Sequence, residues 1–72
     1  MTDAEQRFLD AVASVLEAPA LGFDDDFRAA CEWCSLKAFG LLVLMENDFA
    51  TPLNLADLER LRTVRELYSV KI

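Results

Sequence analysis

Residues 36–45 of this 72-residue chain are apolar almost all the way round a helix. The segment reads Leu-Lys-Ala-Phe-Gly-Leu-Leu-Val-Leu-Met and carries one charge, on Lys37. A globular domain buries such a helix on every side only when enough protein surrounds it, and a chain this short cannot wrap a central helix completely. Part of the helix must therefore face solvent, a partner or a ligand, and the hydroxyl of Ser35 stands at its first turn.

Composition indicates one small domain, residues 1–72, with a well-formed core, because 54% of the residues are hydrophobic. The formal net charge of -6 comes from thirteen acids and seven bases, which argues against nucleic-acid binding. No run approaches the roughly 18 apolar residues that a membrane span needs. The start of the chain, with Asp3 and Glu5, is unlike a secretory signal. We therefore expect a cytoplasmic protein without a membrane span.

A first helix is expected from a cap at Asp3 to about Glu17, before Pro19. Its buried stripe should be Phe8, Ala11, Val12 and Val15. A long connection, residues 18–34, follows, and loops of this length in small domains are often functional. Its expected anchors to the core are Phe23, Phe27 and Trp33.

The second helix is expected from Ser35 to about Phe49. Helical spacing places its apolar residues, and Asn47, on two stripes. The stripe expected to face the core is Ala38, Leu41, Leu42, Met45 and Phe49. The stripe on nearly the opposite side is Leu36, Phe39, Gly40, Val43 and Asn47. The second stripe is surplus apolar surface.

Two shorter helices complete the pattern after the break at Thr51-Pro52. Asn54 can cap the first of them, whose inward residues should be Leu55, Leu58 and Leu61. Thr63 and Glu66 have the spacing of a capping box that opens a last helix. Its inward residues should be Val64, Leu67 and Tyr68. No segment alternates like a strand, so the expected fold is all-α, with four helices, one of them short.

The approach to Ser35 reads Phe27-Arg28, four residues, and then Trp33-Cys34-Ser35-Leu36. It resembles the approach to the modified serine in acyl and peptidyl carrier proteins, which commonly reads Asp-Ser-Leu, often with a tryptophan just before it. Downstream spacing agrees, since Phe49 and Leu53 fall where the family has similar residues. Thr63-Val64 fall where the family closes its third helix. The similarity extends from the first helix to Tyr68.

The resemblance implies a four-helix acyl-carrier-like bundle with a long first loop and a short third helix. It also implies that Ser35 carries 4′-phosphopantetheine, whose thiol holds acyl or aminoacyl groups as thioesters in lipid or secondary-metabolite biosynthesis, such as fatty acid or polyketide synthesis. A phosphodiester on Ser35 would lie at a helix N-terminus, where free N–H groups and the helix dipole favour an anion. Such a protein is a shuttle and not an enzyme.

The partners that the resemblance implies are a phosphopantetheinyl transferase, acting with coenzyme A and a divalent metal, and enzymes that load and transfer acyl groups. These partners would dock on the second helix, at Leu36, Phe39, Val43 and Glu46. A shuttle that visits several enzymes is expected to be a monomer.

The sequence departs from the family pattern in two ways. Cys34 replaces the acid before the serine, and Lys37 and Gly40 stand where docking helices often carry acids. Partners should therefore recognise this face more by apolar contact than by charge. Two alternatives stay open: Phe39 could pack under the loop, or the protein could be an unmodified helical adaptor with this face as its interface.

Cys31-Glu32-Trp33-Cys34 is a C-x-x-C motif, which can mark a redox pair or half a metal site. Zinc needs about four ligands, and the chain has no histidine and no other cysteine. Two reduced cysteines are the favoured interpretation, with Cys31 buried under the loop. The acidic run at residues 24–26 lacks the spacing of a calcium loop and should form a solvated turn. We expect no metal.

Overall fold

The protein consists of four helices and one long loop, in a computed structural model that describes residues 2–70. In chain order the helices are α1 (Asp3–Leu16), α2 (Ser35–Phe49), α3 (Leu55–Glu59) and α4 (Val64–Val70). Within residues 2–70 the extended pairing is limited to one isolated bridge, between Asp26 and Thr63. The expected all-α class, the long first loop and the short third helix are confirmed.

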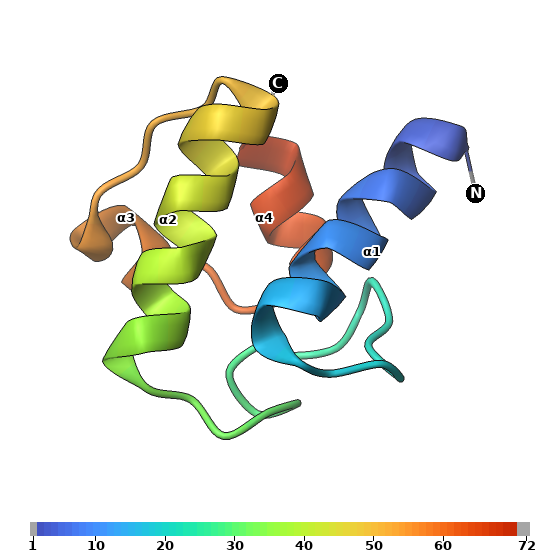
Figure 1. Cartoon of the computed structure of the whole chain (residues 1–72), viewed down its shortest axis with the longest axis horizontal. Helices are drawn as coiled ribbons and strands as arrows, with labels where there is room; N and C mark the ends of the chain where they lie inside the picture. The colour runs from blue at the N-terminus through green and yellow to red at the C-terminus, as the bar shows by residue number, and fades with distance from the viewer. Residues whose placement is uncertain (1, 71–72) are drawn as a thin grey trace.

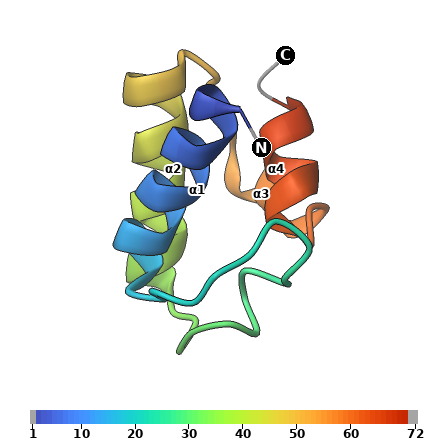
Figure 2. The same ribbon diagram turned by 90° about the vertical axis from the view of Figure 1, so that its right-hand side faces the viewer.

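Helices α1 and α2 lie side by side, α4 packs on α1, and α3 lies at the edge of α2 (Figure 1). The long loop crosses the end of the molecule where α1 ends and α2 begins (Figure 2). Phe23 and Phe27 are buried and Trp33 is half-buried, so the predicted loop anchors are confirmed. The backbone N–H of Phe27 donates to the carbonyl of Arg62, at 3.2 Å, which joins the loop to the segment before α4.

The sequence suggested Asp3 as the N-terminal cap of α1, but the cap is Thr2. The Thr2 hydroxyl accepts from the N–H of Glu5, at 3.2 Å, and the Glu5 carboxylate accepts from the N–H of Thr2, at 3.0 Å. Thr2 has the extended backbone that a cap requires, whereas Asp3 is already helical. At the other end Glu17 adopts a left-handed conformation, with φ of 55°, and ends the helix two residues before Pro19.

The core face of α2 is broader than the predicted stripe. Ala38, Leu41 and Met45 are buried as expected, and Leu42 and Phe49 are half-buried against the core. Leu44 of α2 is also buried and was not predicted, and neither were Leu9 and Leu16 of α1 or Ala18 and Leu21 of the long loop. Gly40 was assigned to the outer stripe, but a Cβ there would lie 3.0 Å from Cγ1 of Val15. Gly40 differs from the prediction because α1 approaches α2 closely at this position, and Leu44 lies one turn further along the same side of α2.

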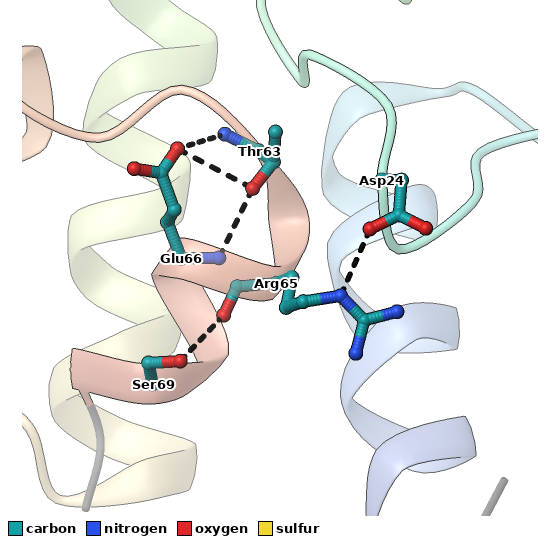
Figure 3. Close-up of polar contacts among 5 residues, drawn as sticks. All are labelled: Asp24, Thr63, Arg65, Glu66 and Ser69. Carbon is teal, nitrogen blue, oxygen red and sulfur yellow. Dashed lines mark hydrogen bonds and ion pairs between the residues drawn. The ribbon is translucent and has the colours of Figure 1, made fainter.

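The predicted cap of α3 at Asn54 and the predicted Thr63–Glu66 capping box are both confirmed. The Asn54 side chain accepts from the N–H of Asp57, at 2.8 Å, at the start of α3. The Thr63 hydroxyl accepts from the N–H of Glu66, at 3.2 Å, at the start of α4 (Figure 3). Thr63-Val64 therefore open α4 and do not close the third helix, which ends at Glu59. The Thr63–Glu66 capping box predicted the start of α4 correctly, because it depends on residues within one helical turn. The family resemblance placed Thr63-Val64 in the wrong helix.

Leu58, Val64 and Leu67 are buried as predicted, and Leu61 and Tyr68 are half-buried against the core. The prediction for Leu55 is wrong, because this side chain is 53% exposed. Helix α3 has only five residues and lies at the edge of α2. Leu58 reaches the core from it, and Leu55 is left at the surface beside the start of α2.

Candidate functional site

Ser35 is the first residue of α2 and is exposed. Cys34 is the N-cap, with an extended backbone, and its side chain makes no capping hydrogen bond. The carbonyl of Cys34 accepts from the N–H of Ala38, at 3.1 Å. The N–H groups of the first turn, at Ser35, Leu36 and Lys37, have no acceptor within the helix. This end of α2 therefore suits an anion on the Ser35 oxygen.

The segment before Ser35 is held by Arg28. The guanidinium of Arg28 lies over the rings of Phe27 and Trp33, with its central carbon 5.1 and 6.0 Å from their centroids. It also donates hydrogen bonds to the carbonyl of Leu58, at 3.2 Å, and to that of Leu61. Arg28 thus ties Trp33 to the end of α3. No role for Arg28 was predicted, although a base beside Phe27 in an acidic loop was a usable signal.

Two grooves flank the start of α2, and Trp33 lines both. The first, here called the α2–α3 groove, has a volume of about 380 Å³. Its lining is Trp33, Ser35, Ala38, Phe39, Leu42, Leu55 and Glu59. The second, the α1–α2 groove, has a volume of about 630 Å³. Its lining is Val15, Glu17, Glu32, Trp33, Cys34, Leu36, Lys37 and Gly40. Leu55 and Glu59 were missed as site residues because no local pattern places α3 beside Ser35.

An exposed apolar face runs along α2 from the turn that carries Ser35. Leu36, Phe39 and Val43 are 80%, 55% and 40% exposed. Glu46 is exposed, and helical spacing sets it at the edge of the same face. The structure therefore gathers the four predicted docking residues on one side of α2. At 55% exposure Phe39 is not packed under the long loop, so that alternative is wrong.

The cysteines do not form a disulfide: both are free, with Cys31 half-buried and Cys34 exposed. The burial predicted for Cys31 is therefore only partial, and its thiol lies 3.4 Å from the carbonyl of Phe27, to which it donates. Among residues 2–70 no three His, Cys, Asp or Glu side chains are grouped so that they could hold a metal ion. None of the helices in this range has the length and hydrophobicity that a membrane-spanning segment needs.

The acidic run is an organised turn and not merely a solvated one. Asp24 pairs with Nε of Arg65 at 2.8 Å (Figure 3), and this guanidinium lowers the pKa of the Asp24 carboxyl. The Asp25 carboxylate accepts from the N–H of Gly22, at 2.7 Å, and that of Asp26 from the N–H of Arg28, at 2.9 Å. Each of the three carboxylates has a different partner, so the three do not point toward a common metal position.

These features define a small four-helix domain that presents a free hydroxyl at the start of its central helix, between two grooves and beside an apolar face. A family model described as a phosphopantetheine attachment site matches residues 6–70. The chain belongs to this family, whose domains are non-catalytic carriers of covalently attached 4′-phosphopantetheine. No curated protein and no solved structure matches the chain. The exposed hydroxyl and the uncapped first turn of α2 fit the phosphodiester of this group.

Proposed function

We propose that this protein carries acyl or aminoacyl groups as thioesters on 4′-phosphopantetheine attached to Ser35. The observation that supports Ser35 is its contrast with the other hydroxyl-bearing side chains. Four serine and threonine hydroxyls already make hydrogen bonds: Thr2, Thr51, Thr63 and Ser69. Ser14 lies within α1, whereas Ser35 stands at an uncapped helix start.

The chain's own groups explain why this position suits the arm. The first-turn N–H groups and the dipole of α2 favour a phosphodiester anion by about 0.3–1 kcal/mol at an exposed site. Because Ser35 is exposed at the start of α2, a group attached to its oxygen can extend into solvent or along either groove. The bound group supplies a thiol, on which cargo is held as a thioester. Reactions of the cargo belong to the partner enzymes.

The partners that we propose are a phosphopantetheinyl transferase and enzymes that load and transfer acyl groups. They dock on the α2 face formed by Leu36, Phe39 and Val43, and Glu46 offers negative charge to a basic patch at its edge. Charge supports this arrangement, because the chain carries a net charge of -6 and steers basic partners toward itself. We place the protein in the cytoplasm, as a monomer, in lipid or secondary-metabolite biosynthesis.

Intact-mass measurement tests the attachment. Purified protein is incubated with a broad-specificity transferase, magnesium and coenzyme A, beside the variants Ser35→Ala and Ser14→Ala. The expected result is a gain of one phosphopantetheinyl group in the wild type and in Ser14→Ala, but none in Ser35→Ala. Ser14 is the matched control because it is an exposed serine of another helix.

The absence of any gain with several transferases, in both the wild type and the variant Cys34→Asp and from protein shown by circular dichroism to be folded, contradicts the proposal. That result favours the alternative of a helical adaptor that uses the α2 face as a permanent interface. The variant Cys34→Asp, which introduces the acid common in the family before the serine, separates a poorly recognised carrier from an adaptor. A gain of mass in this variant alone still assigns Ser35 as the attachment point.

A further inference from the structure

Within residues 2–70, three of the four helices begin with a capping box, and α2 does not. At the starts of α1, α3 and α4 a hydroxyl or amide side chain accepts from a backbone N–H, and an acid accepts from the backbone of the cap. Cys34 holds this position in α2 and makes no side-chain capping hydrogen bond. A helix start without a cap frays more readily than a capped one. The turn that carries Ser35 therefore needs another source of order.

Contacts of the long loop supply this order through Trp33, two positions before Ser35. The ring of Trp33 packs against the buried ring of Phe27, with the two centroids 5.7 Å apart. The guanidinium of Arg28 lies over both rings, with its central carbon 5.1 Å from the centroid of Phe27 and 6.0 Å from that of Trp33. Both distances are within the range of cation–π attraction, about 6 Å. Side-chain contacts thus hold the segment that a cap would otherwise hold.

Arg28 is itself fixed by further hydrogen bonds. Its guanidinium donates to the carbonyl of Leu58, in α3, and to that of Leu61, which follows α3. Its backbone N–H donates to the carboxylate of Asp26, at 2.9 Å. A guanidinium has five N–H donors in one rigid plane, so it can bond two carbonyls and still present its face to an aromatic ring. These contacts fix the position of Trp33 relative to α3.

We propose that Arg28 is a positioning residue for the modification of Ser35, because it holds Trp33 and thereby keeps the uncapped start of α2 in the conformation that the transferase binds. This inference rests on the attachment proposed above. Arg28 acts through Trp33 and not on the hydroxyl itself. Without Arg28 the start of α2 is ordered in only a fraction of the molecules, and the apparent affinity of the transferase falls by that fraction.

Arg65 provides a matched control. Its guanidinium lies over the ring of Phe23, with the central carbon 5.3 Å from the centroid, and its Nε pairs with Asp24 at 2.8 Å (Figure 3). Arg65 therefore makes the same two kinds of contact with the long loop as Arg28 does. Phe23 and Asp24 line neither of the two grooves beside Ser35. Arg65→Ala thus loosens the loop without removing a contact of Trp33.

The first readout needs no transferase. Trp33 is the one tryptophan of the chain, so quenching of its fluorescence by acrylamide reports its exposure. We expect stronger quenching in Arg28→Ala than in the wild type, and wild-type quenching in Arg65→Ala. Arg28→Lys should be intermediate, because lysine keeps the charge but lacks the planar fork. Circular dichroism checks that each variant folds, and Arg28→Lys supplies the comparison where Arg28→Ala does not.

The second readout is the rate of transfer from coenzyme A to Ser35, followed by intact mass at several protein concentrations. Arg28→Ala should raise the KM for the protein by roughly fivefold or more with kcat little changed, which corresponds to an ordered start in about one molecule in five or fewer. Arg65→Ala should keep the wild-type KM. A loss of overall stability does not raise KM while the protein remains folded.

A local cap should replace the contacts of Arg28. Serine is a favoured N-cap residue, so Arg28→Ala combined with Cys34→Ser should recover the wild-type KM. Arg28→Ala combined with Cys34→Ala, which cannot cap, should not recover it. Cys34→Ser alone measures any direct effect of the new hydroxyl on the transferase. Recovery with serine but not with alanine assigns the effect of Arg28 to the start of α2.

Three results overturn the inference while leaving the attachment at Ser35 in place. An unchanged KM in Arg28→Ala shows that the transferase does not need this anchor. Equal increases in Arg28→Ala and Arg65→Ala show a general effect of loosening the loop. Failure of Cys34→Ser to recover the KM shows that Arg28 does not act through the start of α2. By contrast, no modification of either the wild type or Cys34→Asp contradicts the proposed function itself, and the inference fails with it.

Discussion

Arg28 lies over the ring of Trp33, with the central carbon of its guanidinium 6.0 Å from the ring centroid. The same side chain donates hydrogen bonds to the carbonyls of Leu58 and Leu61. One residue of the long loop therefore connects the segment that precedes Ser35 with the end of α3. These contacts link positions about thirty residues apart in the sequence, so the loop is part of the structural framework of the site.

Removing this connection should destabilise the protein. We expect Arg28→Ala to lower the free energy of unfolding by about 1.5–3 kcal/mol, the usual contribution of hydrogen bonds that involve a charged group. Urea denaturation followed by circular dichroism measures the loss. The control is Arg7→Ala, an exposed residue of α1, which should change the stability by less than about 0.5 kcal/mol. Equal effects of the two changes would show that the Arg28 contacts contribute nothing specific.

The start of α2 can be stabilised by one substitution. Cys34 is the N-cap of α2, but its side chain makes no capping hydrogen bond. Aspartate is a favoured N-cap residue, because its carboxylate accepts from N–H groups of the first turn. We expect Cys34→Asp to raise the free energy of unfolding by about 1 kcal/mol, seen as a higher urea midpoint. Cys34→Ala, which cannot cap, should give no gain, and a gain in that variant would assign the effect to loss of the thiol.

Acid should destabilise the fold through the capping boxes. Hydrogen bonds from the backbone N–H groups of Thr63 and Arg62 lower the pKa of Glu66 below its ordinary value of 4.5, and those from Thr2 lower the pKa of Glu5. Because the folded pKa lies below the unfolded one, this stabilisation is complete above about pH 4.5 and is lost as the pH falls through the folded pKa.

The measurement is the urea midpoint as a function of pH, between about pH 3 and pH 6. Glu66→Gln should have a shallower decline at the acid end than the wild type, because the amide does not titrate. Asp48→Asn, which changes an exposed acid in the last turn of α2, serves as the control. A decline in Glu66→Gln as steep as in the wild type contradicts the assignment.

The outer face of α2 is expected to govern docking. Phe39→Glu places a charge in the centre of the apolar face and should abolish thioester loading or transfer by the cognate enzyme, because the charge loses its hydration on binding. Phe39 is 55% exposed, so the variant should stay folded, as circular dichroism can verify. Val70→Glu changes an exposed apolar residue of α4 and should leave loading intact. An unchanged loading rate in Phe39→Glu rules out this docking face.

Prediction from the sequence succeeded where the signals are local. The ends of α2, the cap of α3 at Asn54 and the Thr63–Glu66 capping box depend on groups within one helical turn of each other. The exposure of Leu36, Phe39 and Val43 could also be predicted, because a chain of 72 residues cannot cover such a helix. The choice of Asp3 over Thr2 as a cap failed, since neighbouring cap residues compete and backbone geometry selects between them.

The four helices, the long loop, the hydroxyl at the start of α2 and the surplus apolar surface could all be predicted from local patterns in the sequence. The residues that these features contact depend on how the helices pack together. This packing buried Leu44, brought Gly40 against Val15, exposed Leu55 beside Ser35 and joined Arg28 to the end of α3. The reason is physical: helix formation and capping act over three or four residues, whereas each of these contacts joins elements that are distant in the chain.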